Sequence, residues 1–385
     1  MGPKEVRCPV TQLLWIGAIG FLTGATSLYA AGQDATPAAQ VPPNPVLSQR
    51  PAPPPKSPLV PEGRIKLDVM VSDAAGHPVP GLEPWDFKIV DNNQPRKVMS
   101  FRAYDGVQVK PDPPVQTILV LDTVNLPFSE VAIVRQQVEA FLRQNGGKLA
   151  LPTTLILLSD KGAQVQPRPS VDGNAIASVV NGIKGSVRML DSAMGGEGLL
   201  ERFQLSVRNI TAIAESEARR PGRKLLIWVG PGWPLLNRSD LGYSGMYQKQ
   251  WFASIVELSR ALREAQISVY SVAPATDSNA YTFVYQSFLK GVPTYQQADT
   301  GNLALKVLAM QTGGLALGPD NNLVGQLNQC VAEASAYYRI SFDPPAAARG
   351  DEYHDLKVVV DKPGTVVRTT TGYYNEPAET NPAAK

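Results

Sequence analysis

Between residues 117 and 335, short apolar runs alternate with segments of helical periodicity, and this alternation restricts the possible folds more than any other feature. The first run, Ile118-Leu119-Val120-Leu121, contains no polar residue, which is typical of a strand buried on both faces of a parallel sheet. Pro127 then opens a segment with apolar residues at helical spacing, and Gly146-Gly147 closes it. Because the same alternation recurs along the region, it predicts a doubly wound α/β domain with a mostly parallel sheet.

The remaining strands and helices of this domain are expected at defined places in the sequence. After the strand at 154–158 an irregular stretch leads to a helix centred on 200–214. The later strands are expected at 225–229, 267–272 and 315–317, and the later helices at 251–262, 302–311 and 320–336. Parallel sheets of this kind bind ligands beyond the carboxyl ends of their strands.

Both flanks of the α/β region change to the period of two that is typical of half-buried strands. Ile65, Leu67, Val69 and Val71 alternate with polar residues on one flank, and strands of the same kind follow Tyr337 on the other. Neither flank holds enough strands to bury two faces by itself. We therefore predict that the N- and C-terminal strands pack jointly into one β-sandwich of six or seven strands, with the α/β domain inserted between them.

The first residues of the chain have the layout of a secretory signal. Lys4 and Arg7 precede an uncharged run that continues to Gln33 and is most apolar from Leu13 to Leu22. Cleavage near residue 31 would release an exported chain that is periplasmic, attached to the cell envelope or secreted, whereas an uncleaved segment would act as an anchor. No later segment is apolar enough to cross a bilayer.

A proline-rich segment separates this signal from the first predicted strand. Residues 34 to 61 contain ten prolines, a composition that favours an extended spacer over a packed core. The predicted organisation is a signal peptide at 1–31, a Pro-rich linker at 32–61, an N-terminal β unit at 62–106, the α/β domain at 115–336, C-terminal strands at 337–374 and a disordered tail at 375–385.

The charge and composition of the chain exclude several classes of function. With 36 basic and 34 acidic residues the net charge is +2, so no strong field attracts nucleic acid. Two histidines and two cysteines exclude most zinc sites, iron–sulfur clusters and disulfide scaffolds. Acid–base catalysis through histidine could use only His77 or His354, and both are expected to be structural. The composition therefore favours a protein that is not an enzyme.

A basic cluster and a cysteine are expected to have structural roles. Arg219, Arg220, Arg223 and Lys224 lie between a helix and a strand, where a solvated cap at the helix C-terminus is the expected role. Cys330 shares a helical face with Leu323 and Leu327 and is expected to be a buried apolar side chain.

Several short motifs resemble those of a known family. The pieces that carry the resemblance are Gly76 to Leu82 with Asp86-Phe87, then Leu121-Asp122-Thr123-Val124-Asn125, Thr312-Gly313-Gly314 and Thr371-Gly372-Tyr373-Tyr374. Together they resemble the von Willebrand factor A-type domain, and more narrowly the bacterial proteins with a related domain, which are usually exported. The resemblance covers roughly residues 62–375 and implies the α/β fold predicted above.

Members of this family bind a divalent cation through Asp-x-Ser-x-Ser after the first strand, a Thr in a later loop and an Asp after the fourth strand. Asp122 matches the first Asp, but Val124 and Leu126 stand at the serine positions, and Gly230-Pro231 follows the fourth strand where the distal Asp is expected. Hard cations need about six oxygen ligands with carboxylates among them. We therefore expect no cation and no other cofactor. Unconventional ligands for a cation would come from Asp122, Asn125, Asp191 and Ser192.

The loop after the fourth strand carries aromatic residues at the edge where such sheets bind ligands. Trp233, Tyr243 and Tyr247 are candidates for contact with a partner, because aromatic side chains are enriched in protein interfaces, although the loop could equally pack over its own domain. The resulting hypothesis is an exported, non-enzymatic, metal-independent protein-interaction module whose protein partner the sequence does not identify. The alternatives are a metal-dependent adhesion module with unconventional ligands around Asp122 and, more distantly, a hydrolase.

Overall fold

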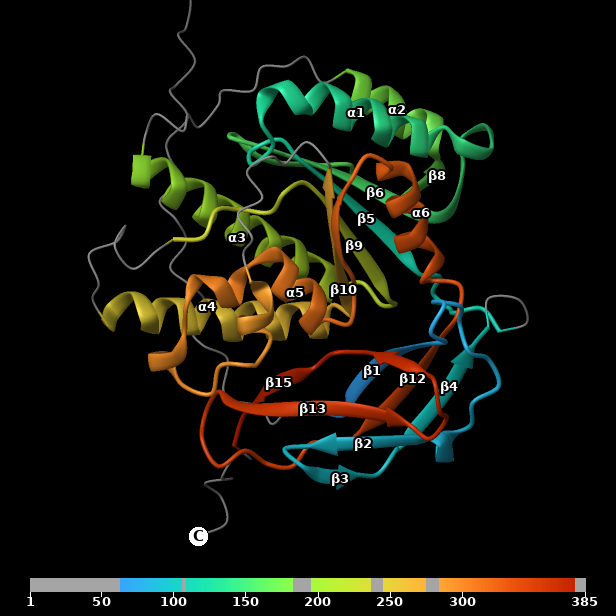
Figure 1. Ribbon diagram of the computed structural model, residues 1–385, viewed down its shortest axis with the longest axis vertical. Coiled ribbons are helices and arrows are strands. Elements are labelled where there is room, and N and C mark those ends of the chain that lie inside the picture. The colour runs from blue at the N-terminus through green and yellow to red at the C-terminus, as the bar shows by residue number, and fades with distance from the viewer. Residues whose placement is uncertain (1–62, 106–108, 183–194, 237–244, 275–283, 378–385) are drawn as a thin grey trace, which may run out of the picture. The chain divides into compact units, whose positions relative to one another are not determined.

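A seven-stranded, mostly parallel sheet forms the centre of the α/β region in the computed structural model (Figure 1). The structure describes residues 63–105, 109–182, 195–236, 245–274 and 284–377. The strand order is β11-β10-β9-β5-β6-β7, and β8 also pairs with β6. The strands are β5 Gln116–Asp122, β6 Lys148–Ser159, β7 Gly162–Val165, β8 Ser170–Asp172, β9 Lys224–Val229, β10 Ile267–Pro274 and β11 Ala316–Asp320. All neighbours pair in parallel except β7 and β8, which run antiparallel to β6.

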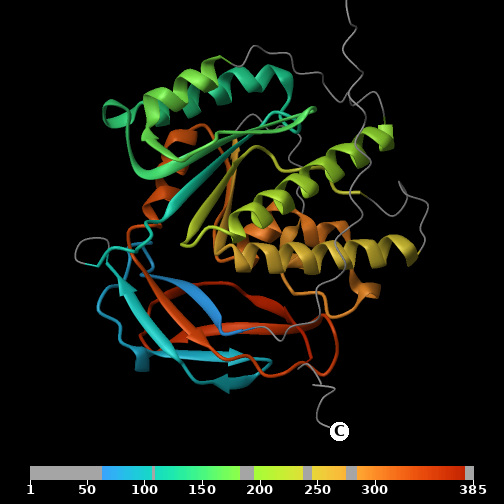
Figure 2. The same cartoon turned by 180° about the vertical axis from the view of Figure 1, so that it is seen from behind.

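Helices cover both faces of this sheet (Figures 1 and 2). One face is packed by α1 Phe128–Leu142, α2 Gly173–Asn181 and α6 Leu323–Ala332. The other face is packed by α3 Gly195–Ala218, α4 Gly245–Glu264 and α5 Leu305–Gln311. Cys330 of α6 is fully buried in the first of these cores. The prediction of a doubly wound α/β domain is confirmed.

Two four-stranded sheets form a β-sandwich beneath the α/β region, and their facing side chains make a third apolar core. One sheet has the order β14-β1-β12-β4 and the other β15-β13-β2-β3. The strands are β1 Ile65–Ser72, β2 Phe87–Asp91, β3 Gln94–Arg96, β4 Ser100–Tyr104, β12 Tyr337–Phe342, β13 Glu352–Val360, β14 Val366–Arg368 and β15 Gly372–Asn375. The sandwich therefore has eight strands rather than the six or seven expected.

Each sheet combines strands from both ends of the chain. In the first sheet β12 lies between β1 and β4, with Leu67 opposite Ile340 and Phe101 opposite the same residue on the other side. In the second sheet β13 pairs with β2 over Leu356–Val360. The N- and C-terminal strands thus build one sandwich, as predicted, and the α/β domain is inserted between β4 and β12.

Two regions differ from the expected secondary structure. The stretch expected to be irregular after β6 contains β7, β8 and α2, which are too short to give a clear periodicity. Among the strands expected after Tyr337, the segment from Val366 to Tyr373 was predicted as one strand but is divided into β14 and β15, and between them the backbone N–H of Thr371 donates to the carbonyl of Gln311 in the α/β domain. The strand ladder is interrupted where the chain makes this contact between the two domains.

A buried arginine lies at the contact between the sandwich and the α/β sheet. Arg223, just before β9, donates to the carbonyl of Glu333 at 3.0 Å and lies with its guanidinium 4.4 Å above the ring of Tyr337. Its Nε is 3.7 Å from Asp68 of β1, which also accepts two hydrogen bonds from Arg339. The expectation of a solvated basic cluster is therefore wrong for Arg223, because this side chain is enclosed by both domains.

Lys224, the next residue, is also buried and caps helix ends from inside. Its ammonium donates to the carbonyls of Glu217 and Arg220 near the C-terminus of α3 and of Ala265 after α4. The capping role expected for the basic cluster is present at this residue, but it is performed by a buried side chain rather than by a solvated one. Burial lowers the pKa of Lys224, and the nearby charge of Glu217 opposes this shift.

Candidate functional site

Asp122 is the last residue of β5, at the carboxyl edge of the central sheet. The five residues before it, Thr117–Leu121, are buried between the helix layers, and the aspartate side chain is fully buried as well. A carboxylate in such a place requires hydrogen-bond donors for its oxygens, since burial removes their hydration. The donors of Asp122 therefore determine what this edge can bind.

Four N–H groups donate to the carboxylate of Asp122. Its Oδ1 accepts hydrogen bonds from the backbone N–H groups of Val124 and Asn125, each at 3.0 Å. Its Oδ2 accepts from the side-chain amide of Asn125 at 2.8 Å and from the indole N–H of Trp228 at 2.9 Å. An ionised carboxylate offers about four lone-pair positions. These four donors therefore use the whole accepting capacity of the side chain.

The ionisation of Asp122 reflects two opposing effects. Burial raises its pKa, while the hydrogen bonds from Asn125 and Trp228 favour the charged form and oppose that shift. The net result is a raised pKa. On α3, Arg202 lies within electrostatic range: burial lowers the pKa of Arg202, and the charge of Asp122 opposes this effect.

Aromatic rings cover the Asp122 carboxylate from the α3–α4–α5 side of the sheet. Trp228 of β9 is fully buried, and Trp233 meets its ring edge-on at a centroid distance of 5.3 Å. Gly230 passes so close that an added Cβ would lie 3.0 Å from the Cβ of Asp122. The strand end where the resemblance led us to expect an Asp instead supplies an indole donor and a close glycine backbone.

The other candidate ligands for a cation lie in different surroundings. Asn125 is buried next to Asp122 and also donates to the hydroxyl of Ser206 on α3 at 3.0 Å. Asp191 and Ser192 lie outside the described residues. Leu126 is buried in the core on the α1 side, so it offers apolar contact where an oxygen ligand would be needed. Within the described part of the chain, no three His, Cys, Asp or Glu side chains are grouped so that they could hold a metal ion.

A divalent cation therefore does not fit Asp122 as the structure presents it. Its carboxylate oxygens already accept four hydrogen bonds, and the neighbouring side chains Val124 and Leu126 contribute no oxygen. One oxygen in the cluster does have spare capacity, because Oδ1 of Asn125 is buried without a hydrogen-bond partner. A single amide oxygen falls far short of the roughly six ligands that a hard cation requires.

The three aromatic candidates for partner contact also lie in different surroundings. Trp233 is buried, and its indole N–H donates to the carbonyl of Leu303 at 3.1 Å. Its ring packs into the α/β core against Trp228, which corresponds to the alternative that this loop packs over its own domain. Tyr247, in the first turn of α4, is half-buried and stacks on Trp251 at 6.1 Å. Tyr243 lies outside the described residues.

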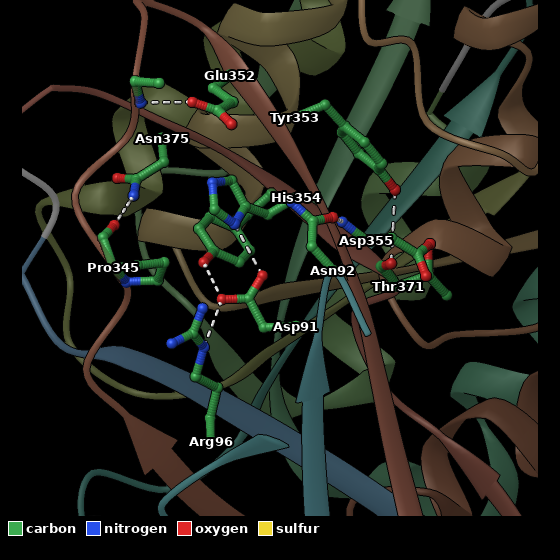
Figure 3. A network of polar contacts seen from close by, with 12 residues as sticks. Asp91, Asn92, Arg96, Pro345, Glu352, Tyr353, His354, Asp355, Thr371 and Asn375 are labelled. Carbon is green, nitrogen blue, oxygen red and sulfur yellow. Dashed lines mark hydrogen bonds and ion pairs between the residues drawn. The ribbon is translucent and has the colours of Figure 1, made fainter. Parts of the chain in front are cut away.

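A second polar cluster, which the sequence did not indicate, lies inside the sandwich (Figure 3). Asp91 of β2 is fully buried and accepts hydrogen bonds from Arg96 at 2.9 Å and from the hydroxyl of Tyr373 at 3.1 Å. Its other oxygen lies 2.7 Å from Nδ1 of His354, whose ring stacks on Tyr373. His354 thus has the structural role expected for it.

The ionisation of Asp91 is set by this cluster. Burial alone would raise its pKa, but the hydrogen bond and charge of His354, with the Tyr373 hydroxyl and Arg96, lower the pKa below its usual value. The only other histidine, His77, is an exposed turn residue whose Nδ1 lies 3.3 Å from Asp73. Neither imidazole faces a nucleophile in the described structure.

Comparison with known proteins gives only weak likenesses. No family model and no curated protein matches the chain. Among solved structures, it is similar to the human COPII-coat protein Sec24c, with 11% identity, a TM-score of 0.34 and coverage of 80% of this chain and 48% of that one. It is also similar to manganese-loaded TRAP protein of Plasmodium vivax (10% identity, TM-score 0.30, 73% of this chain and 98% of that one). A third is von Willebrand factor type A from Catenulispora acidiphila (10% identity, TM-score 0.25, 83% and 75%).

These likenesses do not define a family for the chain. All three identities are 11% or lower, and the chain spans about half the length of the Sec24c chain. The α/β architecture rests instead on the strand order and helix layers described above. None of the helices in the described residues is long and apolar enough to cross a membrane.

Proposed function

We propose that this chain is an exported, non-enzymatic protein-interaction module of the von Willebrand factor A type, which binds a protein partner without a cation. The observation that carries the proposal is the complete use of the Asp122 carboxylate by four N–H donors. A cation would have to displace at least one of these donors from a buried position. Leaving a buried donor unpaired costs about 1–3 kcal/mol, in addition to the missing ligands.

The residues available for acid–base chemistry support a non-enzymatic role. His77 is exposed in a turn, and His354 is enclosed in the sandwich against Asp91. Cys330 is buried on the α1 side of the sheet, and burial raises the pKa of its thiol well above the usual range. A buried thiol in this state is not a nucleophile.

Export is the part of the proposal that rests on the sequence alone. The basic start and apolar run within residues 1–31 have the layout of a secretory signal. A partner would then be another envelope or secreted protein. In this proposal the partner binds at the carboxyl edge of the central sheet, where Tyr247 lies at the start of α4 and Tyr243 precedes it in the sequence.

One observation favours a second candidate, the metal-dependent adhesion module. Oδ1 of Asn125 is buried, has no hydrogen-bond partner and belongs to the side chain that also bonds Asp122. If the loop at 123–126 rearranged, this oxygen and the Asp122 carboxylate could contact one cation together. The two candidates therefore make opposite predictions for divalent ions.

Thermal unfolding of the purified chain with and without Mg²⁺, Mn²⁺ or Ca²⁺ at millimolar concentration separates them. We expect no measurable shift in Tm in any ion and partner binding that persists in chelator. A cation present at 100 times its Kd would add about 2.7 kcal/mol to the free energy of unfolding. This gain would raise Tm by several degrees. An ion-dependent rise in Tm that disappears in Asn125→Ala would establish the metal-dependent module instead, provided that it persists in Asn328→Ala, a control at an exposed position.

A further inference from the structure

Trp85 is the most exposed of the large apolar side chains in the described residues, with 76% of its surface in contact with solvent. It lies in a short 3₁₀ turn, Pro84–Asp86, on the loop between β1 and β2 of the sandwich. A tryptophan normally gains more from burial than any other side chain of a domain core, because it removes the largest apolar area from water. An exposed tryptophan on an ordered loop therefore indicates a surface that binds a partner, so the order of this loop decides the interpretation.

The first half of the loop is fixed to the sandwich by one tyrosine. The hydroxyl of Tyr338 on β12 donates to the carbonyl of Val79 at 2.7 Å and accepts from the N–H of Leu82 at 3.2 Å. The ring of Tyr338 packs on Phe87 at a centroid distance of 5.1 Å, and Leu82 is buried in the sandwich core. The chain therefore enters the Trp85 turn from an anchored position.

The turn itself is closed by its neighbours on both sides of Trp85. The N–H of Glu83 donates to the Asp86 carboxylate at 2.7 Å, and the N–H of Asp86 donates to the carbonyl of Glu83 at 3.0 Å. The carbonyl of Asp86 accepts from the N–H of Asp361 at 2.9 Å, which ties the turn to the end of β13. Trp85 is thus presented by an ordered backbone, and binding through it would require little further ordering.

The charge around Trp85 is acidic. Residues 73–86 contain Asp73, Glu83 and Asp86 but no Lys or Arg. The nearest lysine on the following strand, Lys88, is paired with Asp361 at 3.0 Å. Carboxylate-bearing residues therefore stand on both sides of Trp85 in the chain, at positions 83 and 86.

We propose that Trp85 is the anchor of a second interaction surface, on the β-sandwich, for a partner protein that offers an apolar pocket rimmed by Lys or Arg side chains. An ordered aromatic anchor with complementary charges around it is the arrangement found at interface hot spots. An anionic lipid surface would repel Glu83 and Asp86, so the charges favour a protein over a membrane. This surface is separate from the Asp122 edge, and it does not depend on the function proposed for that edge.

A photoreactive tryptophan analogue at position 85 of the full chain, produced in its native cells, keeps the indole anchor and would nominate the partner by covalent cross-linking. The purified partner is then titrated with the wild-type chain, Trp85→Ala and Val171→Ala. Val171 is the matched control, because it is 53% exposed but lies on β8 of the α/β domain, beside the amino end of β6. We expect Trp85→Ala to weaken binding by about 30-fold or more, the effect of a hot spot, and Val171→Ala to leave it unchanged.

One further variant and one stability measurement make the outcome decisive. Glu83→Lys should weaken binding by reversing the charge beside the indole, with a loss that is smaller in high salt. Trp85→Ala should keep the Tm of the wild type, because exposed substitutions away from structural contacts change stability little. Equal affinity of Trp85→Ala and the wild type would overturn the proposal. It would also fail if position 85 cross-linked only to the same chain or to a second copy, or if the chain bound anionic vesicles through Trp85.

The same titration keeps this inference distinct from the proposed function of the Asp122 edge. Tyr247→Ala tests that edge, and Trp85→Ala tests the sandwich surface. A partner that loses affinity only with Tyr247→Ala would support the first proposal and contradict the second.

Discussion

The indole N–H of Trp228 on β9 donates a 2.9 Å hydrogen bond to Oδ2 of Asp122 on the neighbouring strand β5. Both side chains are fully buried, so the indole of an aromatic core residue supplies one of the four N–H donors that the Asp122 carboxylate accepts. The neighbouring strand β9 therefore supplies a hydrogen-bond donor to the buried carboxylate at the end of β5. The relationship makes Trp228 a structural partner of Asp122 as well as a core residue.

Replacing Trp228 with Phe removes this donor and should destabilise the protein measurably. A hydrogen bond to a charged group contributes about 1.5–3 kcal/mol, against about 1 kcal/mol for a neutral pair. Trp233→Phe is the matched control, because its indole donates to the neutral carbonyl of Leu303 in the same core. We expect the free energy of unfolding, measured with urea, to fall by about 1 kcal/mol more for Trp228→Phe than for Trp233→Phe. Equal losses would show that only ring volume matters.

The Asp91 cluster should make the sandwich sensitive to acid. Its neighbours hold the pKa of Asp91 below its usual value, so the unfolded chain takes up a proton at this residue before the folded protein does. The stabilisation is fully present above the unfolded pKa of about 3.9. It is lost as pH falls through the lower pKa of the folded state.

The stability difference between the wild type and Asp91→Asn should therefore shrink between pH 5 and pH 3. Thermal unfolding at a series of pH values measures this difference directly. Asp355→Asn is the control, because Asp355 is exposed on the same strand as His354 and should change the profile little. A difference that stays constant over this range would contradict the role assigned to Asp91.

Arg223 should couple the unfolding of the two domains. Its guanidinium contacts Glu333 and Tyr337 and approaches Asp68, so its removal leaves buried polar groups without their partner. Breaking a buried ionic contact of this kind costs about 3–5 kcal/mol. We expect Arg223→Ala to lower Tm strongly in calorimetry and to split one transition into two, whereas the exposed Arg219→Ala should keep the single transition.

Sequence patterns were sufficient to predict those parts of the fold that local burial determines. The apolar run at Ile118–Leu121 predicted a central strand, and the alternation from Ile65 and after Tyr337 predicted a shared sandwich. The network around Asp91 could not be predicted in this way, because its members come from β2, β3, β13 and β15 and meet only after the sheets form. The sequence left the position of Trp233 open for a similar reason: its partners Trp228 and Leu303 are 5 and 70 residues away.

The insertion of the α/β domain into the sandwich predicts that the C-terminal strands cannot form without the N-terminal ones. A chain that begins at residue 112 lacks β1 to β4, so β12 loses both of its neighbours and β13 loses β2. The apolar side chains of β12 and β13 would then face water, and isolated strands are not stable there.

We expect the 112–385 chain to aggregate or to unfold without a cooperative transition in calorimetry. A chain that begins at Gly63 is the matched control, because it keeps every strand of the sandwich and should unfold cooperatively. Co-expression of residues 63–105 with the 112–385 chain should restore a soluble, cooperatively folded complex, since the missing strands can pair in trans. A soluble 112–385 chain with the Tm of the control would show that the α/β domain folds independently of the sandwich.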